Sequence, residues 1–282
     1  MPEFVTISDP VAGPDASARI RVDRRRTAGQ AAAPLVILGG MTQTLSSWGG
    51  QVRPLAAGRE VIVYEARGQG QTTLSPDDVS PPVHVGDFVR LLDALDVPGP
   101  VDLCGFSFGG RIALAIAAER PERVRRLVLS GVSAGRGALG RVIVRAWQKS
   151  LATGDLETLA WLSLADTLGP TYLAQNEHVL AAMVKATVQR NHYEGIRALF
   201  SQTLDDDAAS PWQPLHLAPR VRAPALLIAG ELDRLAPAPE VAALAAAFTP
   251  AARFEILPGV GHTVAIEAPE RWRALVLGFL SQ

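Results

Sequence analysis

Residues 101–111 read VDLCGFSFGGR, an apolar run followed by one serine that stands between glycines. The run VDLC is typical of a strand buried on both faces, and RIALAIAAER after it has the spacing of a helix. Gly105-Phe106-Ser107-Phe108-Gly109 therefore fits the G-x-S-x-G pattern of a nucleophile elbow, a sharp strand-to-helix turn. Such a turn lifts the serine hydroxyl above the sheet, at a helix N-terminus where the dipole favours developing negative charge. The stretch predicts a nucleophilic Ser107 beyond the end of a parallel strand.

The rest of the chain alternates short apolar runs with helical patterns. EFVTI and ARIRVD indicate an opening hairpin, and the later runs end in turns that carry glycine. This alternation predicts the α/β class, with a doubly wound, mostly parallel sheet whose ligands bind beyond the carboxyl ends of its strands. Residues 134–219 contain only helical patterns, which predicts a helical cap. The cap is inserted before the acid-bearing strand, the run PALLIAG (residues 224–230) that precedes Glu231 and Asp233. We expect a core formed by residues 1–133 and 220–282, with the cap between them.

Composition narrows the class of protein. The chain has 282 residues, a hydrophobic content of 48% and a net charge of −1, which argue against a general binder of nucleic acid or anionic membranes. Its one cysteine, Cys104, excludes an internal disulfide and is typical of a reducing cytosol. No signal peptide or long apolar run is visible, and no His, Cys and carboxylate cluster has metal-ligand spacing. We expect a cytoplasmic enzyme for a small molecule, without metal or cofactor; nothing indicates an oligomeric state.

A serine hydroxyl needs a neighbouring base to become a nucleophile at neutral pH. The chain has five histidines, and the position of His262 favours it, because LPGVGHTVAIEAPERW follows the last apolar run and precedes the closing helix. That loop is expected at the face formed by the carboxyl ends of the parallel strands, where Ser107 also lies. His84 begins a predicted helix away from this face, whereas His178, His192 and His216 lie in the predicted cap.

The base in turn needs a carboxylate that orients its ring and stabilises the imidazolium. LLIAGELDRLAP offers Glu231 and Asp233 just past a strand end. Asp233 lies deeper in the turn and is better placed to reach across, so we favour it, with Glu231 as the alternative. Residues 123–141, which follow the preceding strand, contain no Asp or Glu, and this absence supports Asp233.

The tetrahedral oxyanion of acyl transfer needs two preorganised N–H donors. Phe108 directly follows the serine and supplies one donor at the helix N-terminus. The loop GGMTQT after an earlier strand supplies the other, because Gly39 and Gly40 permit a tight turn that aims the Met41 N–H at the same point.

Serine, acid and histidine in this chain order, with an upstream oxyanion turn and a helical insertion before the acid, resemble the α/β-hydrolase fold superfamily. The resemblance covers nearly the whole chain from about residue 15. It implies that Ser107, Asp233 and His262 form a catalytic triad, with the N–H groups of Met41 and Phe108 as the oxyanion hole.

The chain departs from the common pattern of this superfamily at two places. Many members have His-Gly at the oxyanion turn, where this chain has Gly39-Gly40. Many have D-x-R-G-x-G-x-S after the fourth strand, with His at the central variable position, where residues 65–72 here read EARGQGQT. Both departures can reshape the floor of the pocket, and neither touches the triad.

Several residues are placed to contact a substrate. They are Gly40, Phe106, Arg111, Trp147 and Trp161. Arg111 stands one helical turn past Ser107 and could hold a substrate carboxylate, although an arginine here more often pairs with protein groups. The GGR arrangement is also similar to that of the menaquinone-pathway enzymes that eliminate pyruvate to form a cyclohexadiene carboxylate. That resemblance implies further arginines in the cap, for which the candidates are Arg145, Arg190 and Arg197.

Three functions are compatible with these residues. The first is hydrolysis of an ester, thioester or lactone of a small, largely apolar molecule through an acyl-enzyme on Ser107. The second keeps the triad and uses its base for elimination, with loss of a carboxylate or cleavage of a carbon–carbon bond in a biosynthetic pathway. The third is a binding protein of the same fold without turnover, against which the complete set of serine, acid and histidine argues.

Overall fold

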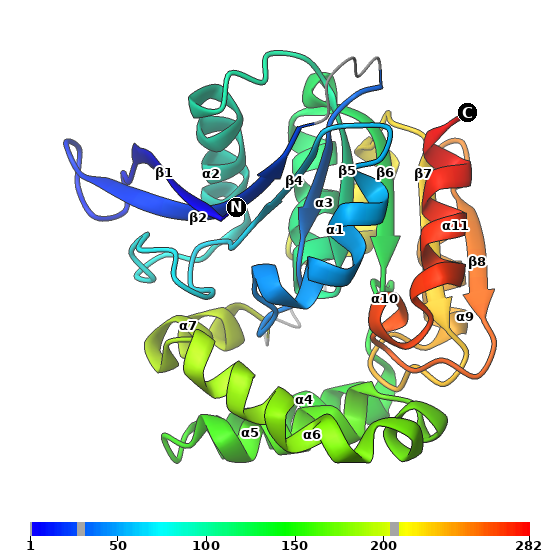
Figure 1. The fold of residues 1–282 in the computed structure, drawn as a ribbon. Coiled ribbons are helices and arrows are strands. Elements are labelled where there is room, and N and C mark those ends of the chain that lie inside the picture. The colour runs from blue at the N-terminus through cyan, green and yellow to red at the C-terminus, as the bar shows by residue number, and fades with distance from the viewer. Residues whose placement is uncertain (1, 27–31, 204–208) are drawn as a thin grey trace.

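A computed structural model describes residues 2–26, 32–203 and 209–282 of the protein, and an eight-stranded sheet lies at its centre. The strands are β1 (Glu3–Ser8), β2 (Ser17–Arg25), β3 (Leu35–Leu38), β4 (Val61–Tyr64), β5 (Val101–Phe106), β6 (Val124–Ser130), β7 (Ala225–Gly230) and β8 (Arg253–Leu257). Their order in the sheet is β1-β2-β4-β3-β5-β6-β7-β8. The opening hairpin is antiparallel and every pair from β4 to β8 is parallel, which confirms the predicted α/β class (Figure 1).

Helices cover both faces of this sheet. Those of the core are α1 (Gly49–Leu55), α2 (Pro81–Ala94), α3 (Phe108–Glu119), α8 (Pro214–Leu217), α9 (Ala238–Ala246), α10 (Val264–Glu267) and α11 (Pro269–Leu280), with short 3₁₀ turns at Leu45–Trp48, Pro121–Arg123 and Ala218–Arg220. The side chains of the sheet form two apolar clusters with these helices. One cluster includes residues of α2, α3 and α9, and the other includes residues of α1 and α11. Successive side chains of a strand point to opposite faces, so Val36 and Leu38 of β3 join the first cluster and Leu35 and Ile37 the second. This double burial explains the unbroken apolar runs in the sequence.

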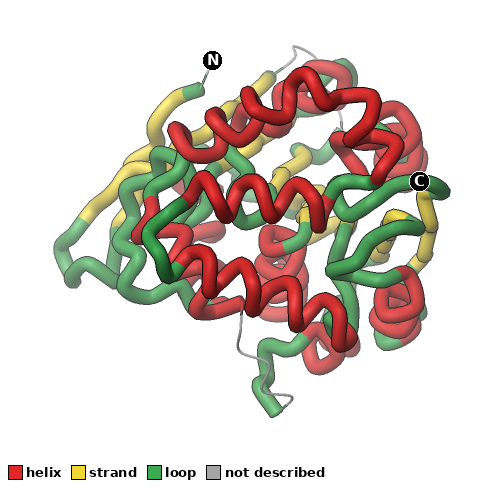
Figure 2. The backbone as a smooth tube through the Cα atoms, turned by 90° about the horizontal axis from the view of Figure 1, so that it is seen from below, coloured by secondary structure: helices red, strands yellow, loops and turns green. Residues whose placement is uncertain are grey.

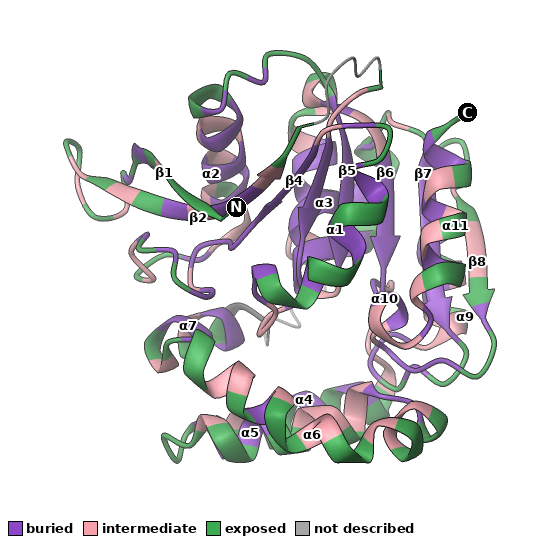
Figure 3. Cartoon of the chain, in the orientation of Figure 1, coloured by how far each residue is buried: buried purple, intermediate pink, exposed green. Residues whose placement is uncertain are grey.

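A separate layer of helices lies beyond the carboxyl ends of the parallel strands. It contains α4 (Gly137–Leu151), α5 (Leu156–Thr167), α6 (Pro170–Arg190) and α7 (Tyr193–Thr203). Figure 2 views the molecule from below, through this layer. Figure 3 shows that its outer faces are largely exposed, whereas the central strands of the sheet are buried. We call α4–α7 the cap. The short helix α8, which the sequence analysis included in the predicted cap region, instead contacts α3 of the core.

No helix in the described ranges is both long and apolar enough to cross a membrane.

Candidate active site

Ser107 occupies the turn between β5 and α3, where its backbone has φ +52° and ψ −116°. Its N–H donates to the Ser130 carbonyl at 2.8 Å, which ties the turn to neighbouring β6. The flanking glycines are required by close approach, because a Cβ on Gly105 would lie 2.5 Å from the Gly110 Cα, and one on Gly109 would lie 2.4 Å from the Gly39 carbonyl oxygen. The G-x-S-x-G pattern is therefore a packing requirement of a strained turn that leaves the serine side chain half-buried.

The structure brings together the three residues expected to form a triad. The Nε2 atom of His262 lies 2.9 Å from Ser107 Oγ, and its Nδ1 atom lies 2.7 Å from Asp233 Oδ2. A carboxylate can only accept, so Nδ1 carries the proton and Nε2 is left as the acceptor for the serine hydroxyl. Both the histidine and the aspartate are buried. This is the arrangement in which the imidazole can remove the proton of Ser107.

Asp233, and not Glu231, is the carboxylate that reaches the histidine. Its other oxygen, Oδ1, accepts hydrogen bonds from the N–H groups of Leu235 at 2.8 Å and Ala236 at 2.9 Å, which hold the carboxylate in one orientation. Glu231 is exposed, and its Oε2 accepts the Gly259 N–H at 2.8 Å. Glu231 thus supports the neighbouring loop, away from the ring of the base.

The oxyanion turn, residues 39–44, lies beside the serine. Gly40 and Met41 line a cavity together with Ser107, and Phe108 is the first residue of α3. An N–H in the first turn of a helix has no acceptor within that helix. Over the described residues, neither the Met41 N–H nor the Phe108 N–H donates to a protein acceptor, so both can donate to a bound oxyanion.

Two residues that the sequence analysis did not single out hold this turn in place. The buried amide of Gln69 donates to the carbonyls of Gly40 at 2.7 Å and Met41 at 3.1 Å, and accepts the Ala66 N–H at 3.1 Å. Asn191, between α6 and α7 of the cap, donates to the Thr42 carbonyl at 3.0 Å. Gln69 stands at the central variable position of the EARGQGQT stretch, where the departure from the family pattern was a signal. Asn191 had no such signal.

An apolar cavity of about 160 Å³ extends from Ser107 toward the cap. Met41 and Phe106 line it on the core side, and Leu164 and Met183 line it from α5 and α6. The ring of Phe106 also packs against His262, with centroids 5.0 Å apart. Gly40 and Phe106, two of the predicted substrate contacts, both line this cavity.

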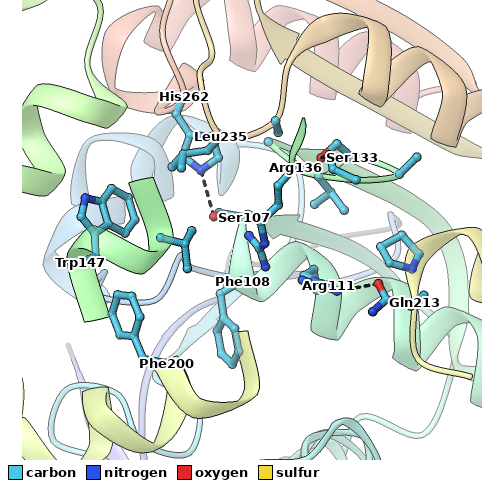
Figure 4. Close-up of a pocket in the computed structure, with 17 residues that line it drawn as sticks. Ser107, Phe108, Arg111, Ser133, Arg136, Trp147, Phe200, Gln213, Leu235 and His262 are labelled. Atoms are coloured by element: carbon cyan, nitrogen blue, oxygen red, sulfur yellow. Dashed lines mark hydrogen bonds between the residues drawn. The ribbon is translucent and has the colours of Figure 1, made fainter. Parts of the chain in front are cut away.

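A second cavity, of about 90 Å³, extends from the same serine in a more polar direction (Figure 4). Arg111 and Arg136 line it, and Arg111 Nη2 donates to Gln213 Oε1 at 3.3 Å. Trp147, Phe200 and Leu235 line both cavities and so stand between them. Trp147 is held there because its Nε1 donates to Asp166 Oδ2 at 2.8 Å.

Trp161 is a correction to the expected set of substrate contacts. It lies on α5 between residues that line the apolar cavity, but Trp161 itself lines neither cavity and is 44% exposed. The candidate cap arginines are corrected as well, because Arg145, Arg190 and Arg197 are exposed and line neither cavity. Arg136, which directly precedes α4, does line the polar cavity.

His84 packs edge-on against Phe108, with ring centroids 5.6 Å apart, behind the first turn of α3. Burial lowers the pKa of His84 to about 4, so this ring is neutral near pH 7. Within residues 2–26, 32–203 and 209–282, no three His, Cys, Asp or Glu side chains gather as a metal site requires.

Comparison with known proteins places this geometry in a family. A family model described as "alpha/beta hydrolase fold" matches residues 33–269. The 2-hydroxymuconate semialdehyde hydrolase of Pseudomonas sp. strain CF600 is 28% identical over 256 residues, covering 88% of this chain and 87% of that protein. The putative 2-succinyl-6-hydroxy-2,4-cyclohexadiene-1-carboxylate synthase of Bacillus subtilis strain 168 is 29% identical over 262 residues, covering 89% of this chain and 91% of that protein.

A solved enzyme structure has a similar fold. The enol-lactonase from Burkholderia xenovorans LB400 superposes with a TM-score of 0.81 at 25% identity, over 94% of this chain and 97% of that one. The relatives and this structural neighbour are enzymes. The chain therefore belongs to the alpha/beta hydrolase fold family and is an enzyme of that family.

Proposed function

We propose that the protein is a serine hydrolase that cleaves an ester, thioester or lactone through an acyl-enzyme on Ser107. The observation that carries this proposal is the continuous hydrogen-bonded path from Asp233 through His262 to the Ser107 hydroxyl. His262 Nε2 takes the hydroxyl proton as Ser107 Oγ bonds to the substrate carbonyl carbon. The Met41 and Phe108 N–H groups receive the oxyanion.

The intermediate then collapses with cleavage of the bond to the leaving group, which takes the proton from His262. A water molecule, deprotonated by the same ring, attacks the acyl carbon and releases the acid with Ser107 restored.

The two cavities that meet at Ser107 suggest the shape of the substrate. Its apolar portion lies toward α5 and α6, where Leu164 and Met183 contact it. Its polar portion lies beside Arg111 and Arg136, whose guanidinium groups suit a carboxylate. Two relatives bear names that contain acidic compounds, a muconate semialdehyde and a cyclohexadiene carboxylate, which is consistent with this orientation.

Elimination is a second candidate, favoured by the pair of arginines beside the serine and by the similarity to the Bacillus subtilis synthase. In that reaction His262, through Ser107, removes a substrate proton and a carboxylate leaves as a double bond forms. Product analysis separates the two reactions, because hydrolysis in H₂¹⁸O places the heavy oxygen in the acid, whereas elimination creates an alkene without it.

The decisive test is intact mass after brief exposure to a fluorophosphonate probe. We expect one adduct on the wild type and none on Ser107→Ala or His262→Ala. Ser133→Ala is the matched control, because Ser133 lines the same polar cavity while its hydroxyl donates to the Gly135 carbonyl at 2.7 Å. Folded wild type that reacts with neither a large nor a small fluorophosphonate would contradict the proposal.

A further inference from the structure

The Glu267 carboxylate, at the end of α10, accepts four hydrogen bonds from the loop that carries His262 and from the cap. Oε2 accepts the N–H groups of Gly261 at 2.9 Å and Gly169 at 2.8 Å. Oε1 accepts the Thr263 N–H at 3.1 Å and the Thr263 hydroxyl at 2.9 Å. The residues immediately before and after His262 are therefore bound to one side chain.

The same loop is joined to the cap through the backbone of the histidine itself. The His262 N–H donates to the Thr167 carbonyl, at the end of α5, over 2.7 Å. Gly169, whose N–H donates to Glu267 Oε2, lies between α5 and α6. The junction of these two cap helices and the histidine loop thus form one hydrogen-bonded unit, with Glu267 at its centre.

The chemistry of this position requires a carboxylate. An ionised carboxylate has about four acceptor sites and no donor, which matches the three N–H groups and one hydroxyl that point at Glu267. A glutamine amide has only one oxygen, and its NH₂ group would face donors. Replacement by glutamine therefore leaves donors without acceptors and lets the loop move.

We propose that Glu267 is a positioning residue that fixes the ring of His262 relative to Ser107 and couples that ring to the cap. The inference rests on the proposed function, in which His262 Nε2 must stay within hydrogen-bond reach of Ser107 Oγ, now 2.9 Å away. A displacement of about 1 Å at such a centre lowers rates about a hundredfold. Glu267 touches neither the substrate cavities nor Ser107, so it acts through the histidine.

The first test compares Glu267→Gln, Glu267→Asp and Glu270→Gln with the wild type. Glu270 is exposed and stands three residues further on, so its variant removes the same charge without disturbing the loop. We expect Glu267→Gln to lower the fluorophosphonate labelling rate and kcat for p-nitrophenyl butyrate about tenfold to a hundredfold with little change in KM. Glu267→Asp, which keeps the acceptors on a shorter side chain, is expected between Glu267→Gln and the wild type.

Two kinetic outcomes overturn the inference. The first is a folded Glu267→Gln variant that reacts as fast as the wild type. The second applies if Glu267→Gln does not fold, and it is a Glu267→Asp variant that reacts as fast as the wild type. A lowered melting temperature with unchanged kcat assigns Glu267 a purely structural role and also overturns it.

A spectroscopic test separates this inference from the proposed function. The hydrogen-bonded Nδ1 proton of His262 gives a low-field proton resonance, whether or not the serine reacts. We expect this resonance in the wild type and in Glu270→Gln, and its shift or loss in Glu267→Gln. An unreactive wild type with this difference contradicts only the proposed function. A reactive wild type whose resonance is the same in all three proteins contradicts only the role of Glu267.

Discussion

The Nε2 atom of His262 lies 2.9 Å from the Ser107 hydroxyl although 155 positions separate the two residues in the chain. The approach is possible because β5 and β8 are parallel members of one sheet, so the turns that follow them reach the same edge. Asp233, in the turn after β7, approaches the other side of the same ring. These hydrogen bonds across three loops are the basis of the first prediction.

Asp233→Asn should lower kcat/KM about 10⁴-fold. The Leu235 and Ala236 N–H groups require an oxygen at Oδ1, so the NH₂ group of asparagine must occupy the Oδ2 position and donate to His262 Nδ1. The proton then sits on Nε2, where it faces the serine and prevents deprotonation. Glu231→Gln is the control, expected within about threefold of wild type. Ester hydrolysis kinetics measure both, and equal losses would contradict the assignment of the acid.

Gln69→Glu should slow acylation about tenfold to a hundredfold, measured by stopped-flow labelling with a fluorophosphonate. An ionised glutamate cannot donate to the carbonyls of Gly40 and Met41 and repels them, which opens the turn that carries the Met41 N–H. Gln71→Glu, two residues further on at an exposed position, makes the same chemical change and should react normally. Normal acylation in Gln69→Glu would exclude this role.

Trp147→Ala should join the two cavities and raise kcat/KM for bulky esters relative to small ones by about tenfold. The indole lines both cavities and is held by Asp166, so its removal opens the wall between them. Trp161→Ala removes an indole that is 44% exposed and should leave the ratio unchanged. A series of p-nitrophenyl esters gives the ratio, and parallel profiles for the two variants would refute the division of the site.

Arg111→Gln should raise KM for an ester with a free carboxylate, with a loss of kcat/KM of about tenfold to a hundredfold, and should affect the matched methyl ester little. The guanidinium lines the polar cavity beside Ser107, where it can pair with the substrate anion. Arg145→Gln, on the exposed side of α4, is the control. Equal losses on the charged and neutral substrates would argue against anion binding here.

The free energy of unfolding should fall as the pH is lowered from about 6.5 to 4, by up to about 1.4 kcal/mol per pH unit from His84. Burial lowers the pKa of this ring to about 4, so over that range the unfolded chain binds a proton that the folded chain excludes. Above about pH 6.5 this contribution is complete. Urea titrations at pH 5 and 7 should show a smaller difference for His84→Leu; an unchanged difference would contradict the prediction.

Much of the fold was readable in the sequence because local patterns report burial directly. Strands covered on both faces favour apolar residues at every position, as in β3 and β4, so the unbroken runs could be recognised. The elbow could be recognised because the turn at Ser107 has no space for a Cβ atom at Gly105 or Gly109. The choice of Asp233 over Glu231 followed from the length of one turn.

The cap was less predictable, because the outer faces of its helices are not constrained by the sheet. Tryptophan is apolar at any position, so the sequence could not distinguish Trp147, which lines both cavities, from Trp161, which lines neither and is 44% exposed. The same reason explains why the sequence did not indicate that Arg136 lines the polar cavity and that Arg145 is exposed. Which face of a helix meets the ligand is decided by packing between helices, and that depends on contacts distant in sequence.

By itself, the sequence determined the class of sheet, the elbow at Ser107 and the order of serine, acid and base, since each rests on short-range patterns or on the end of a strand. Only the tertiary structure decided which groups hold those residues in position. Asn191 and Glu267 are polar residues with no local motif of their own, and their hydrogen bonds cross between core and cap. Such bonds form only after chain segments far apart in sequence have packed together, which is why no local pattern announces them.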